Sequence, residues 1–327
     1  MTTTRRSRRL LVAALAVVAA ALLVYLTLHD GSKQQGAAVP APAGIYLGMY
    51  APNTEPGRFD TAEVEALETR LGRTFAIDHH YYEWQDPFPG SLEQADRDAG
   101  RIPMISWQPT GISLTDIAEG RYDDLLRARA GALKQFDRPV LLRLAHEPNG
   151  DWYTWSERYD RGPAVAGNTA AMYVRAWRHA HDVFAQAGAD NVSWVWSVNF
   201  RDFPADNGAD RYYPGDDAVD WVGIDAYNGG DALPGTTWTG IGPLIAPLYA
   251  TYAPRKPIML TEVGSAEAGG DKAAWVAGLA AELPRRYPEV KAVVWFSKDE
   301  WKVDSSPAAL DAFSALAGSK TFSPAPG

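Results

Sequence analysis

From residue 44 onward, short apolar runs alternate with amphipathic stretches, and this alternation restricts the possible folds more than any other feature. Eight runs have the length of a buried strand: Gly44–Tyr50, Arg73–Ile77, Arg101–Trp107, Val140–His146, Asn191–Val198, Val219–Tyr227, Pro257–Thr261 and Ala292–Phe296. The clearest helical stretches between them are Ala62–Leu71, Tyr122–Phe136, Thr169–Ala187, Lys272–Arg286 and Ala308–Leu316. Repeated strand–helix units of this kind predict an α/β fold, a parallel (β/α)8 TIM barrel formed by a single domain.

A doubly wound open sheet is the competing architecture for alternating strands and helices. It would usually show a glycine-rich phosphate-binding loop after an early strand, and the sequence has no such loop. Polar or aromatic residues instead occur at or just beyond the ends of six runs, where barrel enzymes carry their active sites: Trp107, Glu147, Asn199, Tyr227, Glu262 and Trp295. These strand ends favour the barrel.

The N-terminal residues predict export. Residues 1–9 are basic, and the apolar segment Leu10–Leu28 would span roughly 28 Å as a helix, close to the thickness of a bilayer core. A signal peptide would have a shorter apolar region and a better cleavage site, so we favour an uncleaved transmembrane anchor over a cleaved signal. The basic residues place 1–9 in the cytoplasm and the rest outside. Residues 29–43 are predicted to be a linker, and 44–320 the barrel domain.

Charge and composition narrow the classes of partner. The chain has a net charge of −9, and because residues 1–9 contain four arginines and no acid, the remainder is more acidic still. An acidic body disfavours binding to nucleic acid and is compatible with a neutral polymer. Without cysteine, the chain has no disulfide, no thiolate metal site and no cysteine nucleophile. The acids between 202 and 220 could bind calcium, but they lack the EF-hand order, and a solvated loop is the simpler interpretation.

Two of the strand-end residues are glutamates in informative surroundings. Glu147 follows an apolar run and precedes a Pro-Asn-Gly break with Trp152, Tyr153 and Trp155. Apolar and aromatic neighbours disfavour the charged form of a carboxyl group and raise its pKa, which suits a general acid. Glu262 likewise follows an apolar run directly. Either glutamate alone is more often a solvated loop residue, so the pair carries the argument.

Strand alternation predicts which way the two glutamates point. It places Glu262 on the same face as Ile258 and Leu260. By the same count, Glu147 shares a face with Ala145 and Arg143. If both faces look into the barrel mouth, the two carboxyl groups meet across it. Such a pair is the equipment for glycoside hydrolysis, with about 5–5.5 Å between the groups for retention and about 6.5–9.5 Å for inversion. Arg143 is predicted to lie inside the barrel, paired with an acid.

The stretch from His146 to Gly150, with Trp152, Tyr153 and Trp155, resembles the acid/base motif of glycoside hydrolase family 26. The segments 213–217 and 220–227 are similar to the family's approach to its sixth strand, and the resemblance covers roughly residues 45–315. Pro148 replaces the Met more usual after the acid/base. The family consists of retaining barrel enzymes with the acid/base after strand four and the nucleophile after strand seven, which are the positions of Glu147 and Glu262.

The resemblance implies a role for each matched residue. Glu147 would be the acid/base and Glu262 the nucleophile, without a metal or organic cofactor. The remaining residues would contact the sugar or the nucleophile. His146 would contact the sugar in the −1 subsite or orient the carboxylates, Trp152 would be the aromatic wall of that subsite, and Trp295 the stacking platform under its sugar. Tyr227 would donate to Glu262, and His80, Asn149, Asn199 and Trp107 would line the site. A histidine or aromatic residue taken alone is more often structural, and Trp295 could instead be core.

The function predicted on this basis is an exported, retaining, endo-acting β-glycoside hydrolase that acts on a polysaccharide. The family resemblance favours β-1,4-mannan as the substrate, with mixed-linkage β-glucan and β-1,3-xylan as alternatives. Two other classes of protein stay open at this point. One is a non-catalytic carbohydrate-binding barrel, and the other is a membrane-tethered glycan-assembly factor whose partner is a protein.

Overall fold

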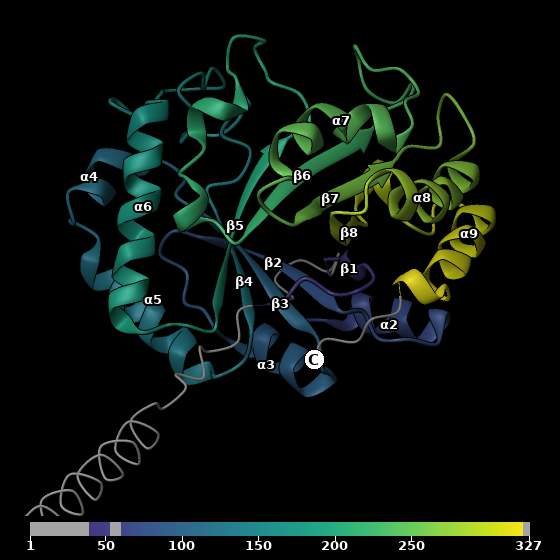
Figure 1. Ribbon diagram of the computed structural model, residues 1–327, viewed down its shortest axis with the longest axis horizontal. Coiled ribbons are helices and arrows are strands. Elements are labelled where there is room, and N and C mark those ends of the chain that lie inside the picture. The colour runs from purple at the N-terminus through teal and green to yellow at the C-terminus, as the bar shows by residue number, and fades with distance from the viewer. Residues whose placement is uncertain (1–38, 53–59, 323–327) are drawn as a thin grey trace, which may run out of the picture.

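A computed structural model describes residues 39–52 and 60–322 and shows the barrel that the alternation predicts. Parallel strands close into a ring in which each strand pairs with its sequence neighbours and β1 pairs with β8 (Figure 1). The strands are β1 (Tyr46–Tyr50), β2 (Ile77–Glu83), β3 (Ile102–Gln108), β4 (Val140–Leu144), β5 (Val192–Asn199), β6 (Trp221–Asn228), β7 (Ile258–Ser265) and β8 (Val290–Phe296). The predicted fold class is confirmed.

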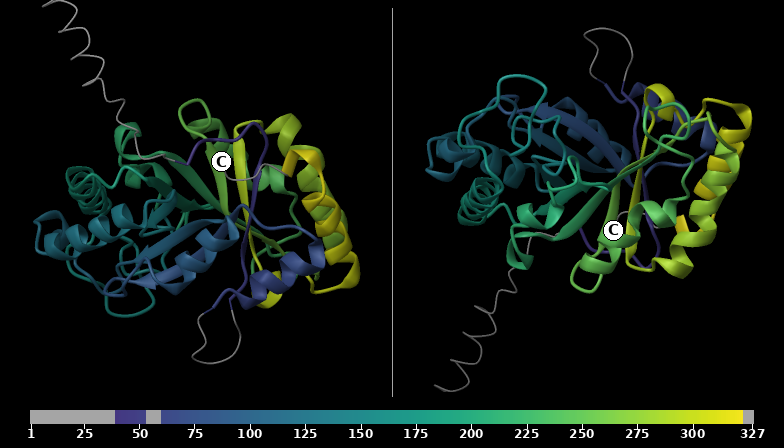
Figure 2. Two further views of the ribbon diagram at one scale, coloured as in Figure 1. Left: turned by 90° about the horizontal axis from the view of Figure 1, so that it is seen from below. Right: turned by 90° about the horizontal axis from the view of Figure 1, so that it is seen from above.

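Helices cover the outside of the barrel. Helices α4 to α6 lie on one side of the molecule and α7 to α9 on the opposite side (Figure 1). The two views in Figure 2 also show the helices outside the ring of strands. The helices are α2 (Ala62–Leu71), α3 (Ser91–Ala99), α4 (Leu114–Ala118), α5 (Asp123–Phe136), α6 (Ala170–Ala187), α7 (Ile241–Tyr252), α8 (Lys272–Arg286) and α9 (Pro307–Ala317). Short 3-10 helices are η1 (Ala209–Tyr212), η2 (Asp216–Ala218), η3 (Asp299–Trp301) and η4 (Lys320–Phe322).

The predicted cytoplasmic residues 1–9 and the predicted anchor or signal segment 10–28 lie outside the described residues. Between residues 39 and 322, again leaving out 53–59, no helix combines the length and apolarity that crossing a bilayer requires. The export of the barrel domain therefore stays a prediction from the sequence.

The sequence of α6 shows how these helices are bounded and attached. The Thr169 side chain caps its N-terminus by accepting the Met172 N–H at 3.2 Å, and Gly188 ends it in a left-handed conformation with a φ of 69°. Buried residues recur every three or four positions along one face, including Tyr173, Trp177 and Phe184. This face holds α6 against the barrel.

Strand alternation separates two apolar cores. Side chains that point away from the barrel axis pack against the helices, as Leu142, Val222 and Val293 do. Inward side chains near the starts of the strands form a smaller cluster: Tyr46, Ile77, Ile102, Met104, Leu141, Val195, Trp221, Met259, Ala292 and Val294. Toward the strand ends the inward positions become polar yet stay buried, at Ser106, Arg143, Ser197, Asp225 and Thr261. This polar layer is the floor of the barrel mouth.

Val39, which was predicted to belong to the linker, packs against the end of the barrel where the strands begin, opposite the polar mouth. Val39 joins the inward apolar cluster, its N–H donates to Ser193 Oγ at 2.7 Å, and its carbonyl accepts the Trp221 Nε1–H at 3.2 Å. An apolar side chain at this open end removes the inward cluster from water, which stabilises the closed barrel. Residues 29–38 of the predicted linker lie outside the described residues.

Two strands differ from the predicted runs. β2 begins at Ile77, the residue at which the run from Arg73 was expected to end, and it continues through a polar and aromatic segment to Glu83. That segment does not alternate between apolar and polar residues, because its inward face lines the polar mouth. β7 extends past the expected end at Thr261 to Ser265, so Gly264 is a strand residue. A Cβ at Gly264 would come within 2.9 Å of Trp301 Cβ, which explains why glycine is suited to this position.

The close packing of the polar layer can be tested at Gly223 on β6. A Cβ there would come within 2.8 Å of Ser197 Cβ and of the Thr261 side chain. We expect Gly223→Ala to lower the free energy of unfolding by about 1–3 kcal/mol, measured by urea denaturation, because it overpacks the barrel interior. The control is Gly278→Ala in α8, where a Cβ would meet nothing within 4 Å. An equal loss in both variants would contradict the packing explanation.

Candidate active site

Glu147 reaches the barrel mouth through a left-handed turn. β4 ends at Leu144, and both Ala145 and Glu147 have positive φ angles, 47° and 49°. Ala145 packs in the helix-facing core, so the expectation that it shares the inward face of Arg143 is wrong. The Glu147 N–H donates to the Ser197 carbonyl at 2.9 Å, which ties the turn to β5. Positive φ at non-glycine residues is strained and is concentrated at functional sites.

Glu262 reaches the same mouth through a β-bulge. The pairing of β6 with β7 shifts by one residue between Ile224 and Asp225, so that Asp225 pairs with Glu262. Ile258 and Leu260 face the helices, and the expectation that they share a face with Glu262 is wrong. The extra residue in the strand turns the next side chain inward, which is a common use of bulges beside active sites.

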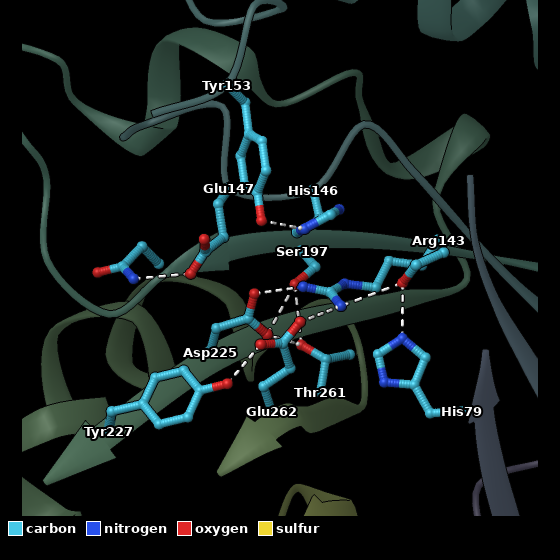
Figure 3. Close-up of polar contacts among 12 residues, drawn as sticks. His79, Arg143, His146, Glu147, Tyr153, Ser197, Asp225, Tyr227, Thr261 and Glu262 are labelled. Atoms are coloured by element: carbon cyan, nitrogen blue, oxygen red, sulfur yellow. Dashed lines mark hydrogen bonds and ion pairs between the residues drawn. The ribbon is translucent and has the colours of Figure 1, made fainter. Parts of the chain in front are cut away.

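Three donors hold the Glu262 carboxylate. Arg143 and Tyr81 both donate to Oε1, and Tyr227 donates to Oε2. Figure 3 shows Arg143 and Tyr227 approaching Glu262, with Asp225 beside them. Arg143 also pairs with Asp225, so one buried guanidinium bridges two carboxylates. Charge-assisted hydrogen bonds of this kind are the strong ones in proteins, and they fix the carboxylate in position.

The protonation state of Glu147 depends on its burial, on one nearby charge and on two hydrogen bonds. Trp152 Nε1–H donates to Oε2 at 2.7 Å, and Asn199 Nδ2–H donates to Oε1 at 2.7 Å. Burial, followed by the negative charge of Glu262, raises the pKa of Glu147 to about 7, although both hydrogen bonds act in the opposite direction. A carboxyl group with this pKa is largely protonated in mildly acidic solution. It can then act as a general acid.

Two buried histidines line the mouth beside these carboxylates. His146 Nε2 lies 2.9 Å from the Tyr153 hydroxyl, and His79 Nε2 lies 2.7 Å from Ser106 Oγ. Burial and then the Arg143 charge lower the pKa of both histidines well below the usual value, so both rings are neutral. A neutral imidazole adds a hydrogen-bonding edge to the mouth without adding another charge to it.

Three of the residues expected to line the site lie outside it for one shared reason. The inward positions at the ends of β2, β3 and β8 belong to other residues, so alternation turns His80, Trp107 and Trp295 toward the helices. Trp107 stacks on Trp84, and Trp295 belongs to the helix-facing core. His80 pairs with Asp96. None of the three can line the mouth or act as a platform there.

The other expected residues lie at or directly behind the mouth. His146, Trp152, Asn199 and Tyr227 contact the carboxylates or their neighbours, as described above. Asn149 is fully buried, donates to the Asn199 carbonyl at 2.9 Å and accepts the Asn199 N–H at 2.9 Å. It therefore braces the loop that carries Asn199 and does not line the surface.

Sequence reasoning missed several residues of the mouth. Strand two was expected to end at Ile77, so Tyr81 was overlooked and His80 was preferred to His79, although alternation from Ile77 would have marked Tyr81 and His79 as inward. Asp225 was seen only as part of a segment with family likeness.

Two aromatic rings occupy the region where Trp295 was expected. Phe296 and Trp301 lie 5.8 and 4.9 Å from the Tyr227 ring, measured between ring centroids. Phe296 follows Trp295 directly in the sequence, and alternation along β8 is the signal that would have preferred it.

One group of side chains has the spacing of a metal site within the described residues. Ligand atoms of Asp78, His80 and Asp96 lie within 4.8 Å of one another. Arg101 Nε lies 2.9 Å from Asp96 and 3.7 Å from Asp78. Burial lowers the pKa of His80, but the neighbouring carboxylates outweigh burial and raise this pKa to about 9. His80 is therefore a cation at neutral pH. Two cations already offset these acids, so the group fits a structural ion-pair network better than a metal site.

The acidic loop between 202 and 220 is held by individual contacts. Arginines pair with three of its acids, and hydrogen bonds engage others: Asp206 with Arg158, Asp216 with Arg255, Asp217 with Arg178, Asp202 with Asn149, and Asp220 with the Trp194 N–H. Within the part of the chain that the structure describes, these acids form no cluster with metal-binding spacing. Their contacts position the loop after β5.

Comparison with known proteins identifies the family. Residues 120–265, which include Glu147 and Glu262, match the sequence profile of glycosyl hydrolase family 26. The chain belongs to this family. Endoglucanase H of Acetivibrio thermocellus is 32% identical over 289 residues, which cover 86% of this chain and 31% of that protein. This family 26 chain therefore spans about a third of that relative's length.

A mannosidase and a xylanase match shorter parts of the chain, and a solved mannanase structure shares its fold. A mannan endo-1,4-beta-mannosidase of Bacillus subtilis (strain 168) is 27% identical over 217 residues, covering 62% of this chain and 51% of that protein. Beta-1,3-xylanase TXYA of a Vibrio species is 31% identical over 148 residues, covering 41% and 29%. The solved structure of Bacillus subtilis mannanase BCman shares the fold, with a TM-score of 0.58, 22% identity and coverage of 87% of this chain and 88% of that one.

The raised pKa of Glu147 has a consequence for stability. Its pKa in the folded protein is about 7 against an ordinary value of 4.5, so the folded state binds more protons between these pH values, and stability falls as pH rises through them. A glutamine at this position cannot ionise. We therefore expect Glu147→Gln to gain stability relative to the wild type from pH 4.5 to 7, by on the order of 3 kcal/mol.

Thermal or urea denaturation at pH 5 and pH 8 measures this difference. Glu289→Gln is the control, because Glu289 is exposed and the change should leave the stability gap independent of pH. A Glu147→Gln profile parallel to that of the wild type would contradict the raised pKa.

Proposed function

We propose that this protein is a retaining, endo-acting β-glycoside hydrolase in which Glu147 is the acid/base and Glu262 the nucleophile. The observation that carries this proposal is the contrast between two carboxyl groups in one mouth. Arg143, Tyr81 and Tyr227 all donate to the Glu262 carboxylate, whereas burial and the charge of Glu262 keep a proton on Glu147. Carboxyl groups whose environments differ in this way divide the acid and nucleophile roles between them.

The first chemical step forms a glycosyl-enzyme. A Glu262 carboxylate oxygen attacks the anomeric carbon, the bond from that carbon to the glycosidic oxygen breaks, and Glu147 protonates the departing oxygen. His146 and His79 are neutral and so add no positive charge that would compete for Glu262. The hydrogen bonds that Tyr227 and Tyr81 donate weaken as the carboxylate becomes an ester, because its charge is lost.

The second step returns the enzyme to its starting state. Once Glu262 is esterified, it no longer carries the charge that raises the pKa of Glu147. Glu147 is then a better base at the same pH, as the second step requires. It removes a proton from water, the water oxygen attacks the anomeric carbon, and Glu262 leaves as a carboxylate. One residue thereby serves both steps because the charge of its neighbour changes between them.

For the substrate we propose a β-1,4-mannan, with export of the barrel to reach it. Support comes from the mannan endo-1,4-beta-mannosidase relatives and from the apolar segment 10–28. The second candidate is a β-glucan, which the name of endoglucanase H favours because that match covers 86% of the chain. We place it second because the chain corresponds to 31% of that protein, whose name can refer to another part of it.

Substitution of the two glutamates tests their roles. We expect Glu262→Ala to lower kcat on every substrate by at least about 10⁴-fold, because no covalent intermediate can form. Glu147→Ala should reduce hydrolysis of polymer severely and spare aryl glycosides with good leaving groups, which need no proton. Initial rates on a dinitrophenyl glycoside and on polymer provide the comparison. Equal losses of Glu147→Ala on both substrates would remove Glu147 from the acid role.

A reducing-sugar screen over mannan, glucomannan, lichenan, β-1,3-xylan and β-1,3-glucan tests the substrate. We expect release from mannan and glucomannan, with short oligosaccharide products of mixed length as endo action requires. Release from lichenan alone would select the β-glucan candidate. Retained binding without release from any polymer would instead support a non-catalytic carbohydrate-binding barrel, and would overturn the proposed function.

A further inference from the structure

Phe203 is an exposed aromatic residue beside the proposed acid/base. It and Leu233 are the large hydrophobic side chains of the described residues that remain clearly exposed, at 42% and 37%. The Phe203 ring lies 6.3 Å from the Trp152 ring at an angle of 33°, and Trp152 in turn donates to Glu147. An exposed apolar surface next to a catalytic group is a candidate for contact with a ligand.

The backbone around Phe203 is fixed to the loop that carries Glu147. The Phe203 N–H donates to the Asn149 carbonyl at 2.8 Å. The fully buried Asn207 donates through Nδ2 to the Pro148 carbonyl at 3.2 Å and lies 3.4 Å from the Phe203 carbonyl. These bonds fix the segment that carries the exposed ring, and a fixed group loses little conformational entropy when a ligand binds to it.

Trp152 is similarly fixed and fills the space between Phe203 and Glu147. Its indole lies so close to the Gly150 backbone that a Cβ at Gly150 would come within 2.4 Å of the ring. The Arg161 guanidinium lies over the same ring at 5.8 Å. Trp152 and Phe203 therefore form an aromatic surface beside Glu147, and Phe203 is its exposed part.

Phe203, the exposed part of this aromatic surface, lies on the leaving-group side of the mouth. The residues that donate to Glu262 come from β2, β4 and β6. By contrast, Asn199 at the end of β5 donates to Glu147, and Phe203 in the loop after β5 donates to the Asn149 carbonyl in the Glu147 loop. A general acid protonates the oxygen that departs. The sugar next to the acid and beyond it is thus the one that leaves, while the sugar that becomes covalently bound sits over Glu262.

We infer that Phe203 is a stacking platform for a pyranose ring of the departing oligosaccharide, a role that rests on the proposed function. The apolar C–H face of a β-linked hexopyranose matches a flat, exposed aromatic ring, and Phe203 has no polar group to direct the hydroxyls. By binding one sugar of the departing chain, Phe203 fixes the register in which a long substrate lies across the mouth. This register determines which glycosidic bond is cut. The same platform holds an acceptor sugar, whose hydroxyl can replace water and receive the glycosyl group from Glu262 while Glu147 removes its proton.

The test compares Phe203→Ala with Phe203→Trp and with Leu233→Ala, the matched control on the loop after β6. One substrate is end-labelled mannohexaose, which can occupy the platform. The other is β-mannobiosyl fluoride, whose leaving group is a single atom and cannot reach it. If the polymer screen selects β-glucan, the corresponding gluco-oligosaccharide and fluoride replace them.

We expect Phe203→Ala to lower kcat/KM on the hexaose by roughly three- to tenfold, the range of a single aromatic contact. It should also shift the cleavage position and reduce transfer to added mannose oligosaccharides. Hydrolysis of the fluoride should stay within about twofold of the wild type, because neither enzyme uses the platform for this substrate. Phe203→Trp should restore the wild-type cleavage pattern, and Leu233→Ala should match the wild type throughout.

The outcomes separate the platform from the proposed function. Unchanged cleavage positions in an active Phe203→Ala enzyme, or equal losses on the hexaose and the fluoride, would overturn the platform alone. Failure of the wild type to hydrolyse any substrate would overturn the proposed function and the platform with it. Circular-dichroism melting of Phe203→Ala distinguishes a lost contact from a lost fold, and the rescue by Phe203→Trp makes the same distinction kinetically.

Discussion

The site depends on the buried contacts of Arg143 with Glu262 and Asp225. A guanidinium taken out of water is costly unless carboxylates and further hydrogen bonds offset the loss, and here two carboxylates and Ser106 engage its Nη1 and Nη2 atoms. The same contacts hold the Glu262 carboxylate in place inside the barrel. Arg143 therefore fixes the position of the nucleophile that we propose. Its own position follows from alternation along β4, which makes it an inward residue.

The charge balance around Arg143 also influences the state of Glu147. The Arg143 guanidinium already pairs with two carboxyl groups in the mouth, and both histidines there are neutral, so Glu147 has no cationic partner of its own. Burial and this charge balance together keep the proton on Glu147. The balance changes when Glu262 is esterified. Acid and base behaviour of Glu147 can therefore follow from a single rearrangement of charge, without movement of the chain.

Much of this arrangement could be predicted from the sequence. The alternating runs predicted the barrel, and the glutamates at the ends of runs four and seven were placed in one mouth. The errors at Trp107, Trp295 and His80 had one origin, because nearness to a strand end was weighed above the direction of the side chain. A residue at a strand end lines a barrel only if alternation turns it inward, as it does for His79 and Phe296.

The sequence by itself determined the order of strands and helices and the chemical character of the residues near the strand ends, because both depend on local patterns of polarity. Only the tertiary structure decided which of those residues meet. The bulge in β7 and the left-handed turn after β4 both break the period of two, and each turns a glutamate into the mouth. Such irregularities are stable only when neighbouring strands hold them, so strand alternation alone could not reveal them.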